Sequence, residues 1–120
     1  MAIQSYQDLI VWQKAMDYVV LCYKLTRSFP KEELYGLTSQ LRRSAVSVPS
    51  NIAEGYGRRT RGEYIQFLGI ARGSLKESET QIILSYRLEY ITNEKMTEAL
   101  ILAKEVSILL NNLIRSLTDK

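Results

Sequence analysis

The sequence predicts an all-α protein, an antiparallel up-down bundle of four helices. Apolar side chains recur at alternating steps of three and four residues through four segments, which is the spacing of amphipathic helices. No segment shows the strict alternation of a β-strand, and the links between the segments are short. A chain of 120 residues has the length of one domain, which we expect to span residues 1–120.

The first predicted helix begins near Leu9 and ends before Pro30, because a proline disfavours helical geometry at the residue that precedes it. Ser5 and Asp8 have the spacing of a capping box at the start of this helix. The predicted core face of the helix consists of Leu9, Trp12, Met16, Val19 and Tyr23.

The second predicted helix contains an unusual stretch, "SVPSNIAEGYGRR", at residues 47–59. Its predicted core face consists of Leu37, Leu41, Ala45, Val48 and Ile52. This stripe keeps its register across Pro49, which favours one continuous helix that is kinked at the proline and ended by Gly55 and Gly57. The alternative is a new helix with Ser47 as its N-cap and Pro49 near its first turn.

A polar stripe flanks the apolar face of the second helix. It consists of Ser44, Ser47, Asn51 and Glu54. One interpretation is structural: these groups satisfy carbonyls freed by Pro49 and bond to a neighbouring helix. The other is a binding site for a ligand or partner. We favour the structural interpretation, because a lone carboxylate without histidine is a poor catalyst.

The third and fourth predicted helices both have capping residues. Thr60 and Glu63 form a capping box for the third, and Thr92 and Asn93 are candidate caps for the fourth. The predicted core face of the third helix consists of Tyr64, Leu68, Ala71, Leu75, Ser78, Ile82 and Tyr86. That of the fourth consists of Met96, Leu100, Ala103, Ser107, Leu110, Ile114 and Leu117.

Two glycines, Gly69 and Gly73, stand four residues apart inside the third predicted helix. Each costs about 0.5–1 kcal/mol relative to alanine in a helix interior. We expect another backbone to approach closely there, either from the same bundle or from a second subunit.

The composition excludes several classes of catalytic site. The chain has no histidine, which removes Ser-His-Asp triads, Cys-His pairs and histidine-bound zinc. Its single cysteine, Cys22, lies among apolar residues and is expected to be a buried, inert thiol. We expect carboxylates such as Glu54, Glu77 and Glu79 to pair with Arg42 or with buried hydroxyls. The expected protein is therefore not an enzyme, with no catalytic residues, metal or cofactor.

The expected location is the cytoplasm, without a membrane association. No apolar run is long enough to span a membrane, and the N-terminal residues lack the pattern of a signal peptide. A lone cysteine fits a reducing compartment.

The net charge of +3 is unevenly distributed along the chain. Residues 34–62 hold arginines without any lysine, opposed by Glu54 alone. These arginines are Arg42, Arg43, Arg58, Arg59 and Arg61. Arginine suits contacts to phosphate, so this segment is the candidate nucleic-acid-binding surface. The alternative is that the first two arginines lie on a solvated helix face and the other three in a polar turn.

Three stretches carry a resemblance to a known family: "YQDLIVWQKAM" (6–16), "GLTSQLRRSAVSVPSNIAEGYGR" (36–58) and "YIQFLGIARGSLKESETQ" (64–81). The chain resembles the four-helix bundle proteins encoded in intervening sequences of bacterial 23S rRNA, a superfamily that includes the accessory variability proteins of diversity-generating retroelements. The residues that match the family pattern are Pro49, Ser50, Asn51, Ala53, Glu54, Gly55, Tyr56, Gly57 and Arg58. Lys76 and Ser78 depart from it.

The resemblance implies a ring-shaped homopentamer with a positively charged surface. In the retroelement relatives it implies RNA or DNA binding and a reverse transcriptase as partner. Two functions follow as hypotheses: a nucleic-acid-binding accessory or scaffold protein, and a protein-interaction module that binds no nucleic acid. Nothing in the sequence supports base-specific reading.

Overall fold

The structure, a computed structural model, describes residues 2–119, which form four α-helices and two short 3₁₀ helices and contain no strand. The elements are η1 (Tyr6–Asp8), α1 (Ile10–Thr26), η2 (Lys31–Glu33), α2 (Leu37–Tyr56), α3 (Arg61–Arg87) and α4 (Asn93–Thr118). The prediction of an all-α four-helix bundle is confirmed.

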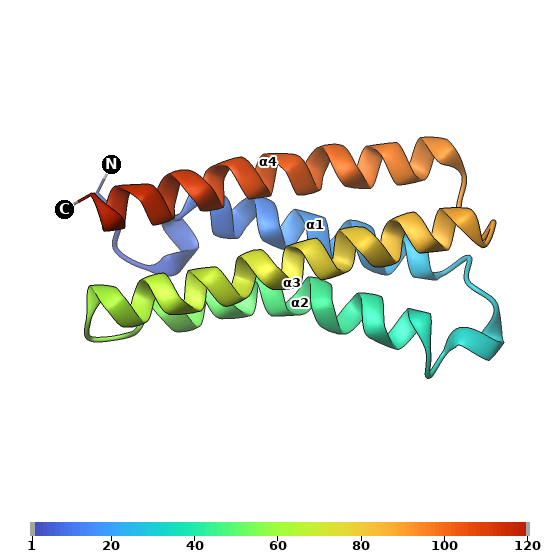
Figure 1. The fold of residues 1–120 in the computed structure, drawn as a ribbon, viewed down its shortest axis with the longest axis horizontal. Helices are drawn as coiled ribbons and strands as arrows, with labels where there is room; N and C mark the ends of the chain where they lie inside the picture. Colours follow the sequence, from blue (N-terminus) through green and yellow to red (C-terminus); the bar gives the residue numbers. More distant parts are fainter. Residues whose placement is uncertain (1, 120) are drawn as a thin grey trace.

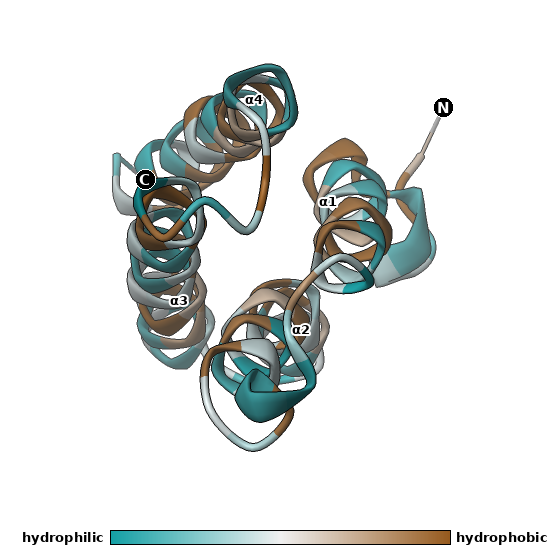
Figure 2. Ribbon diagram, turned by 90° about the vertical axis from the view of Figure 1, so that its right-hand side faces the viewer, coloured by the Kyte–Doolittle hydropathy of each residue, from teal (hydrophilic) through white to brown (hydrophobic). Residues whose placement is uncertain are grey.

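The helices form an elongated bundle of 46 × 25 × 21 Å. The links that join successive helices lie at alternate ends of the bundle, and both chain termini lie at the same end (Figure 1). Viewed along the bundle, α2 lies between α1 and α3, and α4 closes the square diagonally opposite α2 (Figure 2). The apolar faces of all four helices meet in the centre.

The core face of α1 differs from the prediction by one helical position. The buried apolar residues are Val11, Ala15, Tyr18, Cys22 and Leu25. Met16 and Tyr23, predicted in the core, are 40% and 38% exposed. The predicted capping box exists, but Ser5 and Asp8 cap the separate turn η1, and α1 itself begins at Ile10.

Helix α2 is continuous through Pro49, so the alternative of a new helix capped by Ser47 is wrong. Its predicted core face, from Leu37 to Ile52, is buried throughout. The kink at Pro49 stays a prediction.

Thr60 and Thr92 are the N-caps of α3 and α4, as predicted, whereas Asn93 is the first residue of α4, and of the Thr60–Glu63 capping box only the bond to the Thr60 hydroxyl is present. The Thr60 hydroxyl accepts a hydrogen bond from the backbone N–H of Glu63, and Thr92 does the same for Lys95. The predicted core face of α3 holds as far as Ile82, but Tyr86 is exposed. In α4, the predicted core residues Ala103 and Leu110 are buried, and so are Ala99 and Val106, which were not predicted.

A buried polar group joins α1 to α3. The Tyr18 hydroxyl lies 2.6 Å from that of Ser78. Because Ser78 donates its hydrogen to the carbonyl of Leu75 at 2.7 Å, Tyr18 is the donor of the shared bond. Burial raises the pKa of the neighbouring Cys22 thiol to about 12, so this cysteine is the buried thiol that was expected.

Candidate functional site

One side of α2 packs on α3 through short polar contacts, and we call this contact the α2–α3 seam. Ser44 donates to the side-chain oxygen of Gln81 at 2.7 Å. The Ser47 and Ser74 hydroxyls hydrogen-bond at 2.8 Å. Asn51 donates to the carbonyl and the hydroxyl of Ser47, at 2.8 and 2.9 Å. The Ser44 and Ser47 bonds agree with the part of the structural interpretation that joins the polar stripe to a neighbouring helix, whereas the Asn51 bonds lie within α2.

Gly55 allows α2 and α3 to cross closely in the seam. A Cβ atom at Gly55 would lie 2.8 Å from the Cβ of Phe67 and 3.1 Å from a ring carbon of Tyr64. The prediction that Gly55 ends the helix is wrong, since the helix runs on to Tyr56 and Gly57 is its C-cap. The close approach requires a residue without a side chain at this position.

Gly69 and Gly73, in the interior of α3, do not serve such a contact. No heavy atom lies within 4 Å of a Cβ built at Gly69 or Gly73. The expectation of a close backbone within the bundle is therefore wrong for the described residues. An approach by a second subunit stays a prediction.

The opposite side of α2 lines an apolar groove against α1, which we call the α1–α2 groove. It encloses about 350 Å³. Its lining consists of Tyr6, Trp12, Met16, Val19, Val46, Pro49, Ser50 and Ala53. Residues 47, 51 and 55 face the seam, whereas residues 46, 50 and 53 line the groove, so the family-pattern segment is divided between two faces of one helix.

A second hollow of about 500 Å³ adjoins the groove at Val46, and we call it the arginine hollow. Its lining consists of Tyr23, Leu34, Tyr35, Thr38, Ser39, Arg42, Arg43 and Val46. It combines two arginines, two tyrosines and two hydroxyl side chains from α1, α2 and the link between η2 and α2.

The two arginines of the hollow differ in their surroundings. The guanidinium of Arg42 lies over the ring of Tyr23, 4.6 Å from its centroid, and its Nε donates to the hydroxyl of Thr26 at 2.9 Å. Arg43 is exposed and forms no ion pair with the described residues. The hollow thus holds one cation fixed by its contacts and one exposed cation.

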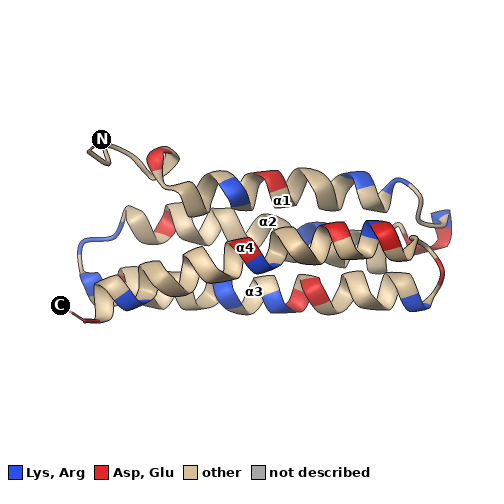
Figure 3. Cartoon of the chain, turned by 90° about the horizontal axis from the view of Figure 1, so that it is seen from above, with Lys and Arg blue, Asp and Glu red and all other residues tan. Residues whose placement is uncertain are grey.

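The other predicted arginines gather at the α2–α3 turn, which Figure 3 shows in blue. Arg58 pairs with Glu54 at 3.0 Å and lies over the ring of Phe67, 4.6 Å from its centroid. The expectation that Glu54 pairs with Arg42 or with a buried hydroxyl is therefore wrong. Arg59 is exposed and has no ion pair among residues 2–119.

The five predicted arginines form two groups along α2. Arg42 and Arg43 lie in its second turn, whereas Arg58, Arg59 and Arg61 lie at its far end. A helical rise of about 1.5 Å per residue separates the groups by roughly 20 Å. Within one chain, the arginine surface is therefore two patches.

The acids of α3 form no metal-binding group. Glu79 pairs with Lys76 at 3.4 Å, and Glu77 accepts a hydrogen bond from Gln81 at 3.4 Å. Within the described part of the chain, no set of three potential ligands converges to hold a metal ion.

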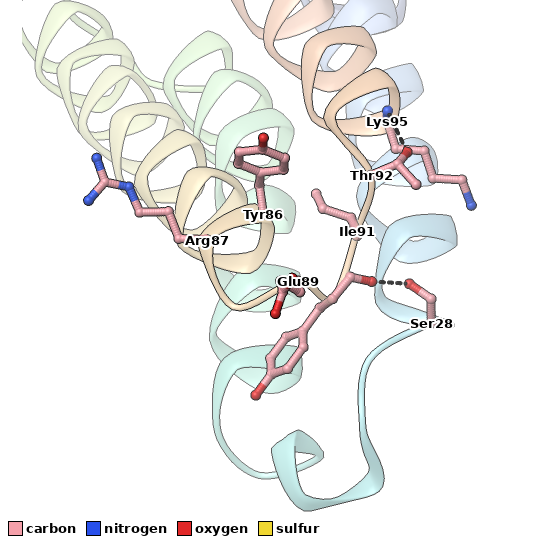
Figure 4. A pocket seen from close by; sticks show the side chains of 8 residues that line it. Ser28, Tyr86, Arg87, Glu89, Ile91, Thr92 and Lys95 are labelled. Carbon is pink, nitrogen blue, oxygen red and sulfur yellow. Dashed lines mark hydrogen bonds between the residues drawn. The ribbon is translucent and has the colours of Figure 1, made fainter.

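A third hollow, of about 540 Å³, lies where the α3–α4 loop meets the end of α1. Figure 4 shows the Arg87 and Lys95 side chains pointing in opposite directions, and Ser28 donates to the carbonyl of Tyr90 at 2.9 Å. Because its charged groups diverge, this hollow is a weaker candidate for binding than the arginine hollow.

The outer surface of α4 carries further exposed apolar residues. Ile101 and Ile108 lie about two helical turns apart and are more than half exposed. Ile108 also lines a hollow of about 450 Å³ between α3 and α4, together with Ile83 and Leu100. None of the helices within residues 2–119 has an apolar stretch long enough to cross a membrane.

Two tyrosines of the arginine hollow were missed as candidate site residues. Tyr23 was assigned to the core, because α1 has apolar side chains on two neighbouring faces. Tyr35 lies between Leu34 and Gly36, at the start of the arginine-rich segment 34–62. An aromatic residue in a short link between two helices is the pattern that indicates an exposed ring here.

Comparisons with known proteins agree with this fold. A model of the 23S rRNA-intervening sequence protein family matches residues 7–112. A crystal structure of a protein of unknown function from the S23 ribosomal protein family of Bacteroides thetaiotaomicron VPI-5482 is 28% identical, with a TM-score of 0.79. The match covers 88% of this chain and 98% of that one. No curated protein matches.

Proposed function

The chain belongs to the 23S rRNA-intervening sequence protein family, and we propose that it is a non-catalytic, oligomeric accessory protein that binds nucleic acid through its arginine patches. The observation that carries this proposal is the pairing of fixed and exposed arginines. Arg42 and Arg58 are each held over an aromatic ring, and each is followed in the chain by an exposed arginine without an ion pair among the described residues, Arg43 and Arg59.

The chemistry of these patches suits phosphate. Arginine binds phosphate oxygens through a planar fork of donors and is weakly hydrated, so its contact with an anion costs little desolvation. The attraction is independent of base sequence and falls as salt rises, because binding releases counterions from the nucleic acid.

Assembly into a ring would multiply the charge. The α1–α2 groove and the Ile101–Ile108 surface of α4 are different apolar faces of one chain, and a contact between unlike faces closes into a ring when the rotation permits. A ring of about five chains would carry a net charge of about +15, enough to attract nucleic acid over a long range.

The direct test is binding of a fluorescein-labelled duplex, followed by anisotropy at about 50 and 200 mM salt. We expect binding at the lower salt and at least about a tenfold loss of affinity at the higher salt. Absence of binding at 50 mM salt would contradict the proposal.

Charge reversal locates the contact. The double variant Arg43→Glu/Arg59→Glu should weaken duplex binding and flatten the dependence of the remaining affinity on salt. The double variant Arg87→Glu/Lys95→Glu is the matched control, since it changes the net charge equally at two exposed residues of the α3–α4 end, outside both arginine patches and the Ile101–Ile108 surface. Equal losses in both variants would indicate a long-range charge effect without a defined surface.

A second candidate function is a protein-interaction module without nucleic-acid binding. The apolar character of the α1–α2 groove favours it, because Trp12 and Met16 offer a surface that another helix can cover. This candidate would stand if no nucleic acid bound at low salt while the purified chain still assembled.

A further inference from the structure

Tyr35 is conspicuously unburied for an aromatic residue. It exposes 93% of its surface, the largest value among the exposed large apolar residues of the described chain, and the adjacent Leu34 is half exposed. Neither side chain belongs to the core. Side chains of this kind are common where a protein contacts a partner, because they gain contact area at a low cost in conformational entropy.

The link that carries Tyr35 is held at both ends. The Glu33 carboxylate accepts a hydrogen bond from the backbone N–H of Leu37 at 3.0 Å and another from the Tyr90 hydroxyl at 2.7 Å. The N–H of Gly36 donates to the carbonyl of Glu33 at 2.9 Å. A ligand that meets Tyr35 therefore meets a link that is already ordered, which reduces the cost of binding.

The arginine hollow beside Tyr35 contains the other groups that a nucleotide needs. The Arg42 guanidinium stacked on Tyr23 provides a flat, fixed cation, and Arg43 provides an exposed one. Thr38 and Ser39 bring hydroxyl groups to the wall of the hollow. Aromatic rings and stacked guanidinium groups bind unpaired bases, and nearby arginines bind the backbone phosphates.

We propose that the arginine hollow binds single-stranded nucleic acid, with one unpaired base stacked on Tyr35 and the flanking phosphate on Arg43. This inference rests on the proposed function and names its substrate class. A volume of about 500 Å³ lies in the range of small-ligand sites and admits a splayed nucleotide. A duplex keeps its bases stacked inside and offers Tyr35 no ring face.

The test compares a labelled 12-nucleotide strand without self-complementarity, as RNA and as DNA, with the same strand annealed to its complement. We expect the single strand to bind more tightly at about 50 mM salt. Tyr35→Ala should weaken single-strand binding by about 5- to 100-fold and leave duplex binding unchanged. Tyr35→Phe should retain single-strand affinity, because the ring face is kept.

The matched control is Tyr86→Ala, which removes a half-exposed tyrosine of α3 outside the hollow. It should bind both forms as the wild type does. Tyr35 makes no core contact, so thermal melting should show that Tyr35→Ala folds normally. Tighter binding of RNA than of DNA would support the proposal and assign a contact to the 2′-hydroxyl.

The outcomes separate this inference from the function it rests on. Equal affinity for single strand and duplex, with no effect of Tyr35→Ala, would overturn the inference and leave the proposed function standing. No binding of either form would overturn both. A Tyr35-dependent affinity for a glutamate-rich peptide, with none for the single strand, would show a protein partner and overturn the inference.

Discussion

On one side of α2, Ser47 hydrogen-bonds to Ser74 of α3 and is held by Asn51 within α2, and Gly55 lies close against α3. On the other side, Val46, Ser50 and Ala53 line an apolar groove that nothing in the described chain fills. Both sets belong to one stretch of twenty residues, Leu37–Tyr56. One sequence signature is thus divided between two surroundings: the seam residues contact α3, and the groove residues line an open apolar surface.

The largest loss of stability should come from Gly55→Ala in the seam. Its new Cβ would lie 2.8 Å from Phe67, so the helices must separate, and we expect a loss of about 1–3 kcal/mol in the free energy of unfolding. Gly57→Ala is the control, because its Cβ would meet nothing closer than 3.6 Å. Urea unfolding measures both, and equal stability of the two variants would contradict a tight crossing at Gly55.

A smaller effect is expected from Ser47→Ala. This variant removes the hydroxyl that bonds to Ser74 and Asn51, which should cost about 1 kcal/mol. The control is Ser50→Ala, three residues along on the groove side, where we expect a change within about 0.5 kcal/mol. If the control lost as much stability as Ser47→Ala, the division of α2 into two faces would be wrong.

The smallest change in stability is expected at Glu33, whose carboxylate holds the link that leads into the arginine hollow. Hydrogen bonds from the Leu37 N–H and the Tyr90 hydroxyl lower the pKa of Glu33 from its ordinary value of 4.5. A lowered folded-state pKa stabilises the protein above the unfolded value, and this contribution is lost as pH falls through the folded value. Wild type should therefore exceed Glu33→Gln in stability at pH 7, and the difference should narrow below about pH 4.5. A pH-independent difference would contradict this role of the carboxylate.

The sequence predicted α2 and the caps of α3 and α4 well, because these features are local. The apolar residues from Leu37 to Ile52 all lie on one face of the helix, so the pattern allows only one buried face. A threonine N-cap bonds to the backbone N–H three residues later, so its partner can be read from the sequence alone. The face of α1 could not be predicted in this way. Apolar side chains occupy two neighbouring faces of α1, and only packing against α2 and α4 decides that Tyr18 is buried and Met16 is not.

The sequence predicted which segment carries the arginines of the candidate site, but not how these arginines are arranged in space. The excess of arginine in residues 34–62 identified the charged segment, but not its division into two patches at opposite ends of α2. The stacking of Arg42 on Tyr23 depends on how α1 is rotated in the bundle, which is a tertiary property. The exposure of Tyr35 likewise depends on how Glu33 holds the link.

Native mass measurement of the wild type beside Met16→Glu tests the division of α2 most directly. Met16 is partly exposed in the groove and makes no contact in the seam, so the Met16→Glu chain should keep the helical content of the wild type in far-ultraviolet circular dichroism. We expect the wild type to give an assembly several times the chain mass of 13.8 kDa, and Met16→Glu to give the single-chain mass. A single-chain mass for the wild type, or an intact assembly for Met16→Glu, would contradict the assignment of the groove to a partner.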